Sequence, residues 1–427
     1  MKLKISIFQK NLSVGDIKNN FISIKESYLK AVENNSDLFL TPELCITGYP
    51  PKDLLLRDDF FEQVVFYTGK IIKLTKKRKT VFVLGFPRKD SKGVFNSLML
   101  IQNGKVISLV DKQILPNYGV FDEKRYFKKG VVKNGFFDYK KLKIKFLICE
   151  DFWDDNFIKK IKKKSVDLII VTNASPYEKD KFDFRLKLAK RRTRDFNAPI
   201  IYINQIGGQD DLVFDGGSFC LNKQEEIIFQ APFFRESDES FFIDLKSNNL
   251  KDRKLENIKS KHVKEAHLYE ALLTGFKDYV YKSGFSSVII GISGGIDSAL
   301  ASVLACDAIG SLNVHGYFLP SKFSSKLSRE DSGDLVKRLK MSLEEISIEE
   351  LRNKYEKTLK ESFKSYTKDV TEENIQSRIR STILMALSNK FNSLLVSTGN
   401  KSELAVGYST IYGDMSGAFS IIKDLYK

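Results

Sequence analysis

The sequence has 427 residues, which is enough for two or three domains with complete hydrophobic cores. Hydrophobic residues make up 42% and charged residues 29%, as in ordinary globular proteins, and no apolar run reaches the length of about 18 residues that a transmembrane helix needs. The formal charge of +16 allows nucleic-acid binding, but the lysines form short, scattered clusters without an RNA-binding aromatic motif. We therefore favour a Lys-rich surface with affinity for small anions, and expect neither a nucleic-acid partner nor a membrane.

The N-terminal stretch MKLKISIFQK enters an alternating strand pattern at once and lacks the apolar segment and cleavage site of a signal peptide, which favours a cytoplasmic location. The cysteines are far apart and form no CxxC pair, which argues against a disulfide framework or a zinc site. They are Cys45, Cys149, Cys220 and Cys306.

Residues 1–245 contain short apolar runs that end in polar or turn residues, a pattern typical of buried central strands. The runs are KISIFQ, DLFLTPE, TVFVLGFP, KFLICED, DLIIVTNAS and PIIYINQ. LMLIQNGKVISLV predicts a hairpin with Asn103 and Gly104 at its tip, and FCLNKQEEIIFQAP predicts a second one. With helical patterns around residues 16–34 and 179–197, these runs predict a layered domain with both helices and strands.

Residues 246–262 are polar, charged and unpatterned, so we take them as a linker to a second domain, residues 263–427. That domain begins with a helical pattern that stops at Gly284. An apolar run at 288–290, NVHGYFLP and SLLVSTGN then alternate with helical patterns at 327–340 and 372–391, which predicts a parallel, doubly wound sheet.

The segment SVIIGISGGIDSALASVLA, residues 287–305, reads as strand, small-residue loop and helix. Small residues let backbone N–H groups turn toward an anion, and the N-terminus of the helix adds a favourable dipole. No lysine follows the glycines, as it does in GxxxxGK[ST] loops. A tight turn that needs glycine for its geometry alone is the alternative interpretation.

SGGIDS resembles the SGGxDS pyrophosphate loop of the ATP pyrophosphatase class. The resemblance implies that the loop holds the β- and γ-phosphates of ATP, which leave together as pyrophosphate after a carboxylate attacks the α-phosphate. Asp297 then becomes a ligand of Mg²⁺, which prefers carboxylate and phosphate oxygens. The implied ATP-binding loop residues are Gly291, Ile292, Ser293, Gly294, Gly295, Ile296, Asp297 and Ser298.

Three downstream segments resemble those of NAD synthetases: LPSKFSS, TEENIQSRIRSTILMALSNK and LLVSTGNKSELAVGYSTIYGD. The resemblance implies that Thr398 contacts ATP and that Asn374 and Glu403 contact deamido-NAD. Open parallel sheets bind ligands at strand ends, where Thr398 is expected, and Glu403 in the loop just beyond is a candidate second magnesium ligand. The alternative for Asn374 is a polar residue near a helix cap.

Cys149 follows the apolar run KFLI and is expected to project from a strand end. A nucleophilic cysteine needs activation, but residues 1–245 contain no histidine. Glu43 and Lys112 follow two other expected strands, and the three together resemble the catalytic triad of the nitrilase superfamily of carbon–nitrogen hydrolases. The alternative is a packed cysteine with a surface glutamate and lysine.

The resemblance implies that Cys149 attacks the carboxamide carbon of glutamine, Glu43 acts as general base, and Lys112 stabilises the oxyanion. Glu123 resembles the supporting glutamate of this family. Tyr118, Ser175 and Lys181 occupy the positions that contact glutamine in the glutamine-dependent members. The other three cysteines are taken as structural.

From Met1 to Lys427 the chain resembles glutamine-dependent NAD synthetases, with the linker matching least. This implies an α/β protein with an N-terminal nitrilase-like α-β-β-α sandwich and a C-terminal doubly wound parallel sheet similar to adenine nucleotide alpha hydrolases. It also implies NAD synthesis from deamido-NAD, ATP and glutamine with Mg²⁺, and a homo-oligomer. Family members usually continue beyond YGDMSG. We therefore expect either that the sequence is a fragment or that the synthetase half is incomplete. In the second case glutaminase activity would be uncoupled from NAD synthesis.

Two alternatives stay open. One is another glutamine amidotransferase of the same ATP class, and the other is a non-catalytic ATP sensor, against which the retained Cys149, Glu43 and Lys112 argue.

Overall fold

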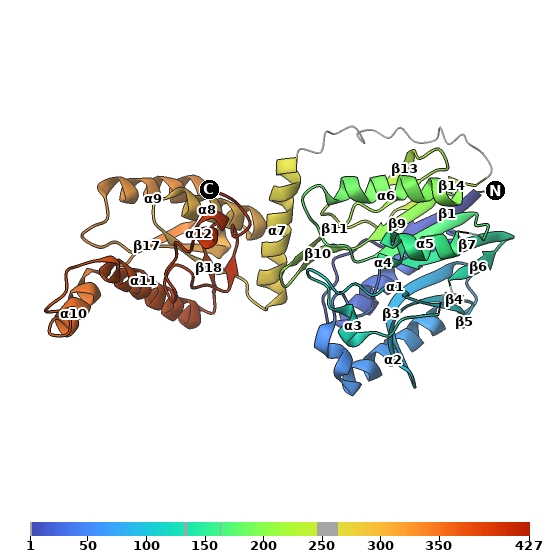
Figure 1. The fold of residues 1–427 in the computed structure, drawn as a ribbon, viewed down its shortest axis with the longest axis horizontal. Helices are drawn as coiled ribbons and strands as arrows, with labels where there is room; N and C mark the ends of the chain where they lie inside the picture. The colour runs from blue at the N-terminus through green and yellow to red at the C-terminus, as the bar shows by residue number, and fades with distance from the viewer. Residues whose placement is uncertain (1, 132–134, 163, 246–263) are drawn as a thin grey trace. The chain divides into compact units, whose positions relative to one another are not determined.

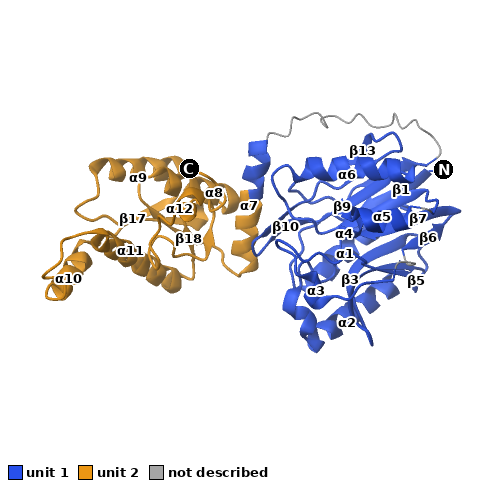
Figure 2. Cartoon of the chain, viewed as in Figure 1, with its two compact units in different colours: residues 1–271 blue, residues 272–427 orange. Residues whose placement is uncertain are grey.

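The computed structural model describes residues 2–131, 135–162, 164–245 and 264–427, so the expected linker, 246–262, lies outside the described residues. The chain divides into two compact units, residues 1–271 and 272–427 (Figure 2). Helix α7 (Lys264–Lys282) contributes to both units, so the domain boundaries expected from the sequence stay a prediction. In the part of the chain that the structure describes, no helix combines the length and the apolar character of a membrane span.

The first unit contains two six-stranded sheets (Figure 1). The first sheet has the order β14 (Ser240–Asp244), β1 (Lys2–Ile7), β2 (Leu38–Leu40), β3 (Val81–Asp90), β4 (Gly93–Gln102), β5 (Lys105–Asp111). The second has the order β13 (Ile227–Gln230), β12 (Phe219–Leu221), β9 (Ile200–Asn204), β8 (Leu168–Asn173), β7 (Leu142–Ile148), β6 (Phe136–Tyr139). A separate ribbon pairs β10 (Ile206–Gln209) with β11 (Leu212–Asp215).

Helices cover the outer faces of both sheets. The helical elements of this unit are α1 (Ile17–Glu33), η1 (Lys52–Leu56), α2 (Asp58–Leu74), α3 (Glu123–Tyr126), α4 (Glu150–Trp153), α5 (Asp155–Ile161) and α6 (Lys181–Phe196). Figure 1 draws α2 and α6 on opposite sides of the two sheets. The layers are therefore helix, sheet, sheet and helix, which confirms the sandwich expected from the resemblance.

Strand β8 shows why the buried runs lack polar alternation. Every residue from Leu168 to Asn173 is buried. Leu168 and Ile170 point into the core between the sheets, whereas Ile169 and Val171 point into the core under α5 and α6. Because both faces of this strand are covered, its apolar residues, Leu168 to Val171, are consecutive and do not alternate with polar ones.

The hairpin expected at LMLIQNGKVISLV is β4–β5, with an antiparallel register. Asn103 and Gly104 connect the strands with φ angles of 49° and 75°. Positive φ at both central residues is the requirement of a type I′ turn, which explains this residue pair. The second expected hairpin is β12–β13.

The second unit has one five-stranded sheet, all parallel. Its order is β17 (Ser342–Glu345), β16 (Val314–Phe318), β15 (Val288–Ile292), β18 (Leu394–Ser397), β19 (Phe419–Ser420). The helical elements are α8 (Ile296–Ile309), η2 (Ser311–Asn313), α9 (Lys326–Leu339), α10 (Glu349–Leu359), α11 (Val370–Phe391) and α12 (Lys401–Val406). Figure 1 draws α8 and α9 on one side of this sheet and α11 on the other, which confirms the doubly wound arrangement.

The winding direction reverses between β15 and β18. From central β15 the chain builds outward through β16 and β17, then returns to place β18 on the other side of β15. In open parallel sheets, ligands bind in the crevice beyond the carboxyl ends of the strands at such a switch point. The small-residue loop after β15 and Thr398 after β18 both lie at this point.

Gly85 on β3 touches the backbone that follows β2. A Cβ at this position would lie 2.7 Å from the amide nitrogen of Leu44 and 3.0 Å from the carbonyl carbon of Glu43. Gly85→Ala therefore forces the backbone around Glu43 to shift, and we expect it to lower the free energy of unfolding by about 1–3 kcal/mol. Denaturant unfolding measures this change.

Gly69 in helix α2 is the matched control, because a Cβ there meets no atom within 4 Å. Gly69→Ala should raise the free energy of unfolding by about 0.5–1 kcal/mol, as alanine restricts the unfolded chain and favours helix. A Gly85→Ala protein that is as stable as the wild type would contradict the close approach.

Candidate active sites at the strand ends

Residues from three strand ends meet inside the first unit. Glu43 comes after β2, Lys112 directly after β5, and Cys149 directly after β7. The Lys112 ammonium donates to Glu43 Oε1 at 2.6 Å and to Glu123 Oε1 at 2.8 Å, and none of these three side chains is more than 5% exposed. The structure thus brings Glu43, Lys112 and Glu123 into one buried cluster, and their charges act on the Cys149 thiol.

Glu43 is held by three donors. Its Oε1 accepts from Lys112 Nζ and, at 2.7 Å, from Asn96 Nδ2 on the neighbouring strand β4. Its Oε2 accepts from the backbone N–H of Ala174, after β8, at 3.0 Å. Both oxygens are therefore directed by partners from different strands, and the carboxylate has little freedom to rotate.

Cys149 sits at a sharp turn between β7 and α4. Its φ is 43° and its ψ is −100°, a conformation that non-glycine residues rarely adopt, and its N–H donates to Thr172 O at 2.9 Å. Burial raises the pKa of the thiol well above its usual range, the Glu43 charge raises it further, and Lys112 opposes them. At neutral pH the resting group is therefore a thiol, which needs a base to become a nucleophile.

Asp151 ties this turn to the loop after β5. It is 2% exposed, and its Oδ1 accepts from the backbone N–H groups of Gln113 and Ile114, both at 2.8 Å. Because Gln113 follows Lys112 and Asp151 lies two residues after Cys149, one carboxylate fixes the spacing of two reacting groups.

The pKa values of Lys112 and of Glu123 are both raised, for different reasons. Burial acts to lower the pKa of Lys112, but the charges of Glu123 and Glu43 outweigh it and raise that pKa well above its usual range. Burial raises the pKa of Glu123 to about 7, partly offset by Lys112 and by the Tyr49 hydroxyl, which donates to Glu123 Oε1 at 2.9 Å. The lysine therefore stays an ammonium, while Glu123 titrates near neutrality.

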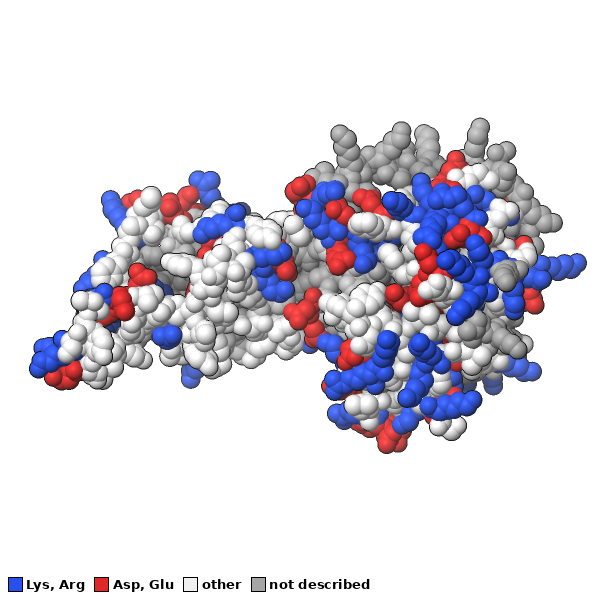
Figure 3. Space-filling model, in the orientation of Figure 1, with Lys and Arg blue, Asp and Glu red and all other residues white. Residues whose placement is uncertain are grey.

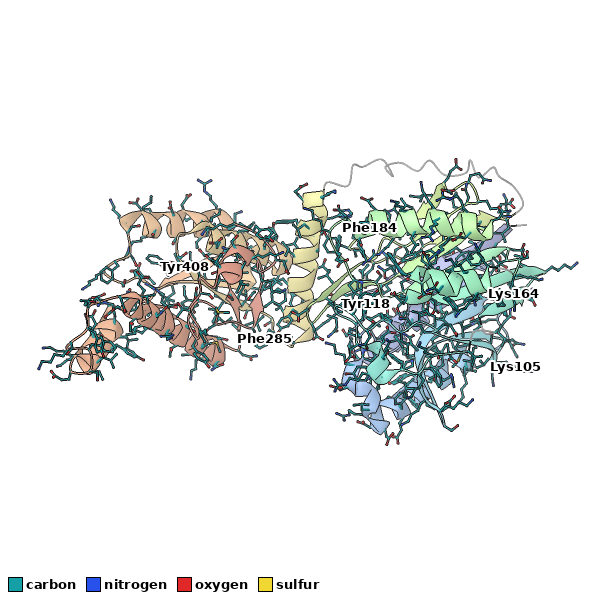
Figure 4. All side chains as sticks on the ribbon, viewed as in Figure 1. Lys105, Tyr118, Lys164, Phe184, Phe285 and Tyr408 are labelled. Atoms are coloured by element: carbon teal, nitrogen blue, oxygen red, sulfur yellow. The ribbon has the colours of Figure 1, made fainter. Side chains whose placement is uncertain are left out.

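The three residues expected to contact glutamine each have a different partner. Tyr118, labelled in Figure 4, is 59% exposed and donates to Glu150 Oε2 at 2.9 Å, and Glu150 is the neighbour of Cys149 in sequence. Lys181, at the start of α6, donates to Glu178 Oε2 at 2.9 Å. Ser175 is buried, two residues beyond β8.

In the second unit, the loop after β15 turns back on itself through its serines. Ser298 Oγ accepts from the Ser293 backbone N–H at 3.2 Å and donates to Gly295 O at 3.0 Å. Gly294 has a φ of 79°, and a Cβ there would lie 2.6 Å from Ser328 O, so only glycine fits. The loop leads into the 14-residue helix α8, whose first-turn N–H groups can receive an anion.

A cavity of about 350 Å³ lies beyond the carboxyl ends of β15, β16 and β18. Its lining includes Gly291, Ile292, Ser293, Leu319, Ser328, Ser377, Arg380, Ser381, Ser397, Thr398 and Asp414. Arg380 donates through Nε to Leu319 O at 2.9 Å, and burial lowers the pKa of its guanidinium. A partly desolvated cation next to a glycine-rich loop suits an anionic ligand.

The family models match in two blocks that cover most of the chain. The carbon-nitrogen hydrolase model matches residues 4–243, and the NAD synthase model matches residues 268–427. The glutamine-dependent NAD(+) synthetase of Acinetobacter baylyi is 40% identical over 425 residues, covering 99% of this chain and 77% of that protein. The chain belongs to the glutamine-dependent NAD(+) synthetase family.

Solved structures agree with this family. The glutamine-dependent NAD(+) synthetase of Acinetobacter baumannii, in complex with adenosine diphosphate, has a TM-score of 0.93 and 39% identity, covering 100% of this chain and 80% of that one. A Nesterenkonia amidase of the nitrilase superfamily covers 57% of this chain and 90% of its own, with a TM-score of 0.51 and 21% identity. The second likeness concerns the fold alone.

One expectation about the synthetase half changes with the structure. Glu403 lies on helix α12 and not in a loop, as the sequence interpretation had it. It forms a capping box with Asn400, in which its N–H donates to Asn400 Oδ1 at 3.0 Å and its Oε2 accepts from the Asn400 N–H at 3.3 Å. Its Oε1 remains directed at Lys427 Nζ, 3.9 Å away, and the same ammonium lies 3.2 Å from Asp297 Oδ2.

Asn374 is the fifth residue of α11, and the N-cap residue of that helix is Asp369. Its Oδ1 accepts from the Thr410 hydroxyl at 2.8 Å. The contact joins the start of α11 to the segment after α12, so Asn374 has a structural partner besides any ligand.

Several neighbours of the site escaped the sequence interpretation of this synthetase. Asn96, Tyr49 and Asp151 hold the reacting groups of the first unit, and Arg380 lines the cavity of the second. None of the four was singled out in the sequence, and no spacing rule links an asparagine at 96 to a glutamate at 43. The Asp151 position, two residues after the cysteine, was the one available signal.

The titration of Glu123 should be visible in the kinetics of glutamine hydrolysis. As pH rises through about 7, Glu123 ionises and its new negative charge further raises the pKa of Cys149. We expect the wild-type kcat to decline above that pH, and Glu123→Gln, which cannot ionise, to lack this decline. A pH–rate profile of both proteins tests the assignment, and an identical decline in the variant would show that another group is responsible.

Proposed function

We propose that the chain makes NAD(+) from deamido-NAD(+), ATP and glutamine, releasing AMP, pyrophosphate and glutamate. The observation that carries the proposal is the buried Glu43–Lys112–Glu123 cluster beside a cysteine thiol, in a chain that also has a glycine-rich loop at the switch point of a parallel sheet. The first arrangement suits amide hydrolysis through a thioester, and the second suits ATP. The family to which the chain belongs combines the two.

In the proposed glutaminase reaction, Glu43 takes the Cys149 proton as the sulfur attacks the carboxamide carbon. The Lys112 ammonium stabilises the oxyanion of the tetrahedral intermediate, and collapse expels ammonia with the proton held by Glu43. Glu43 then activates water, which hydrolyses the thioester to glutamate. The three donors on Glu43 support this role, because they keep a lone pair of its carboxylate in one direction.

Glutamine recognition is proposed for Tyr118, Ser175 and Lys181. A tyrosine hydroxyl, a serine hydroxyl and an ammonium supply donors that match the carboxylate and amide of an amino acid. The hydrogen bond from Tyr118 to Glu150, next to Cys149 in sequence, supports placement of Tyr118 near the thiol.

In the proposed synthetase reaction, the carboxylate of deamido-NAD(+) attacks the α-phosphate of ATP, and ammonia then displaces AMP from the acyl-adenylate. The loop residues Gly291 to Ser298 and Thr398 are proposed to hold ATP, and Asn374 and Glu403 to contact deamido-NAD(+). The cavity that Ser293 and Thr398 line at the switch point supports the ATP assignment.

Mg²⁺ is proposed as the metal, held by Asp297 and Glu403. Both carboxylates face the Lys427 ammonium within 4 Å, so one cation can be shared between them. Among the described residues, no group of three or more His, Cys, Asp and Glu side chains is arranged so that it could hold a metal ion. Two carboxylates completed by phosphate and water oxygens are a usual magnesium environment, so the residues present fit this metal. When bound, the ion neutralises charge on the departing pyrophosphate.

A homo-oligomer and a cytoplasmic location are also proposed. The nitrilase-like sandwich supports isologous packing by family likeness, and the four cysteines, which are all free, suit a reducing compartment.

The products identify the ATP chemistry. Incubation with glutamine, ATP, Mg²⁺ and deamido-NAD(+) is expected to yield NAD(+), AMP and pyrophosphate in equal amounts, measured by chromatography. Formation of ADP and phosphate instead would overturn the proposed attack on the α-phosphate. AMP release with another acid, but not with deamido-NAD(+), would point to a different amidotransferase of the same ATP class.

Cys149→Ala separates the two half-reactions. We expect this variant to lose glutamine-supported NAD(+) formation by at least a thousandfold, because no thioester can form, and to keep the activity that added ammonium supports. Cys220→Ala is the matched control, since Cys220 is also buried in the core between the sheets, but burial alone raises the pKa of its thiol and none of the reacting groups acts on it. Loss of ammonium-supported activity in a folded Cys149→Ala protein would contradict separate sites.

A further inference from the structure

Helix α6 carries a guanidinium that the proposed chemistry does not use. Arg185 is 1% exposed, and its Nη1 donates to Asp215 Oδ1 and Oδ2 at 2.7 and 2.8 Å. Asp215, at the end of β11, is also 1% exposed. Burying an ion pair carries a large desolvation cost, which the pair recovers only when its remaining donors and acceptors are satisfied.

The remaining donors of Arg185 all go to one short loop. Its Nη2 donates to Ser175 O at 2.8 Å and to Pro176 O at 2.9 Å, and its Nε donates to Ser175 Oγ at 3.2 Å. Asn204 completes the enclosure, because its Oδ1 accepts from the Ser175 N–H at 2.9 Å and its Nδ2 donates to Asp215 Oδ1 at 3.2 Å. The backbone of Ser175 is therefore fixed at both its N–H and its carbonyl.

The same loop reaches the general base. Ala174, which precedes Ser175, donates its backbone N–H to Glu43 Oε2 at 3.0 Å. This is the one contact to that oxygen found among the described residues, since Asn96 and Lys112 both donate to Oε1. The orientation of the Glu43 carboxylate thus depends on where the loop 174–176 is held.

We propose that the buried Arg185–Asp215 pair is a positioning device for Glu43, acting through the loop 174–176. A lysine cannot replace the arginine, because its single ammonium lacks the planar fork that serves the carboxylate, two carbonyls and a hydroxyl at once. The assignment rests on the proposed glutaminase role of Glu43 and adds to it two residues that touch neither substrate nor thiol.

Arg185→Lys tests the proposal in the full-length chain. The readout is the rate of Cys149 alkylation by iodoacetamide across pH, located by mass spectrometry, together with kcat and KM for glutamine. With Glu43 displaced, general-base assistance is lost, and we expect alkylation at neutral pH and kcat each to fall about tenfold or more. Asp215→Asn, which keeps the side-chain shape, should show the same direction and serves if lysine at 185 prevents folding.

Arg352→Lys is the control for disturbing a buried arginine. Arg352, on α10 of the second unit, is 3% exposed and pairs with Glu349 and Glu356. We expect Arg352→Lys to lower thermal stability while alkylation at neutral pH stays within about twofold of the wild type.

Two results would overturn the positioning role. One is a wild-type alkylation profile in folded Arg185→Lys and Asp215→Asn, and the other is an equal loss in Arg352→Lys, which would indicate a general effect of disturbing a buried arginine. Because iodoacetamide is not an amino acid, the alkylation result is independent of whether glutamine is the substrate. Failure of glutamine hydrolysis in the wild type would instead count against the proposed function alone.

Discussion

Lys112 places an ammonium group between two carboxylates, those of Glu43 and Glu123, at a point that water does not reach. Burial raises the pKa of Glu123 to about 7, with Lys112 opposing the shift and the Glu43 charge adding to it. Burial and the Glu43 charge likewise keep Cys149 protonated, against the effect of Lys112. The acid–base behaviour of the first unit thus follows from burying one lysine together with two carboxylates and a thiol.

Such a cluster needs a rigid frame, since removing one partner of a buried ion pair typically costs about 3–5 kcal/mol. The frame is the facing pair of six-stranded sheets. Lys112 and Cys149 are the first residues after β5 and β7, and Glu43 is the third residue after β2. Lys and Arg side chains are otherwise spread over the visible surface of this unit (Figure 3), where solvent screens them. The chemistry depends on the few cations that are buried.

The strand ends and the loop after β15 were predictable from sequence because each has a signal in neighbouring residues of the chain. Apolar runs stop near Glu43, Lys112 and Cys149, and the glycines of the loop after β15 reflect a turn in which Gly294 has no substitute. Asn96 and Arg185 were not predictable, because their partners lie far away in the chain and only the folded sheets bring them together. Glu403 could have been placed on a helix, since Asn400 three residues earlier forms the usual capping-box pattern.

Both units close their sheets late during synthesis. Strand β1 has β14, more than 230 residues further on, as one neighbour, and β15 has β18, about 100 residues further on. At about 5–20 residues per second, a ribosome leaves one edge of β1 unpaired for roughly 10–50 s. Open edges attract other strands, so the nascent chain is most exposed to wrong pairing at these two strands. In the second unit the strand left unpaired on one edge is β15, which precedes the loop proposed to hold ATP. The proposed ATP site therefore cannot form before β18 has been synthesised.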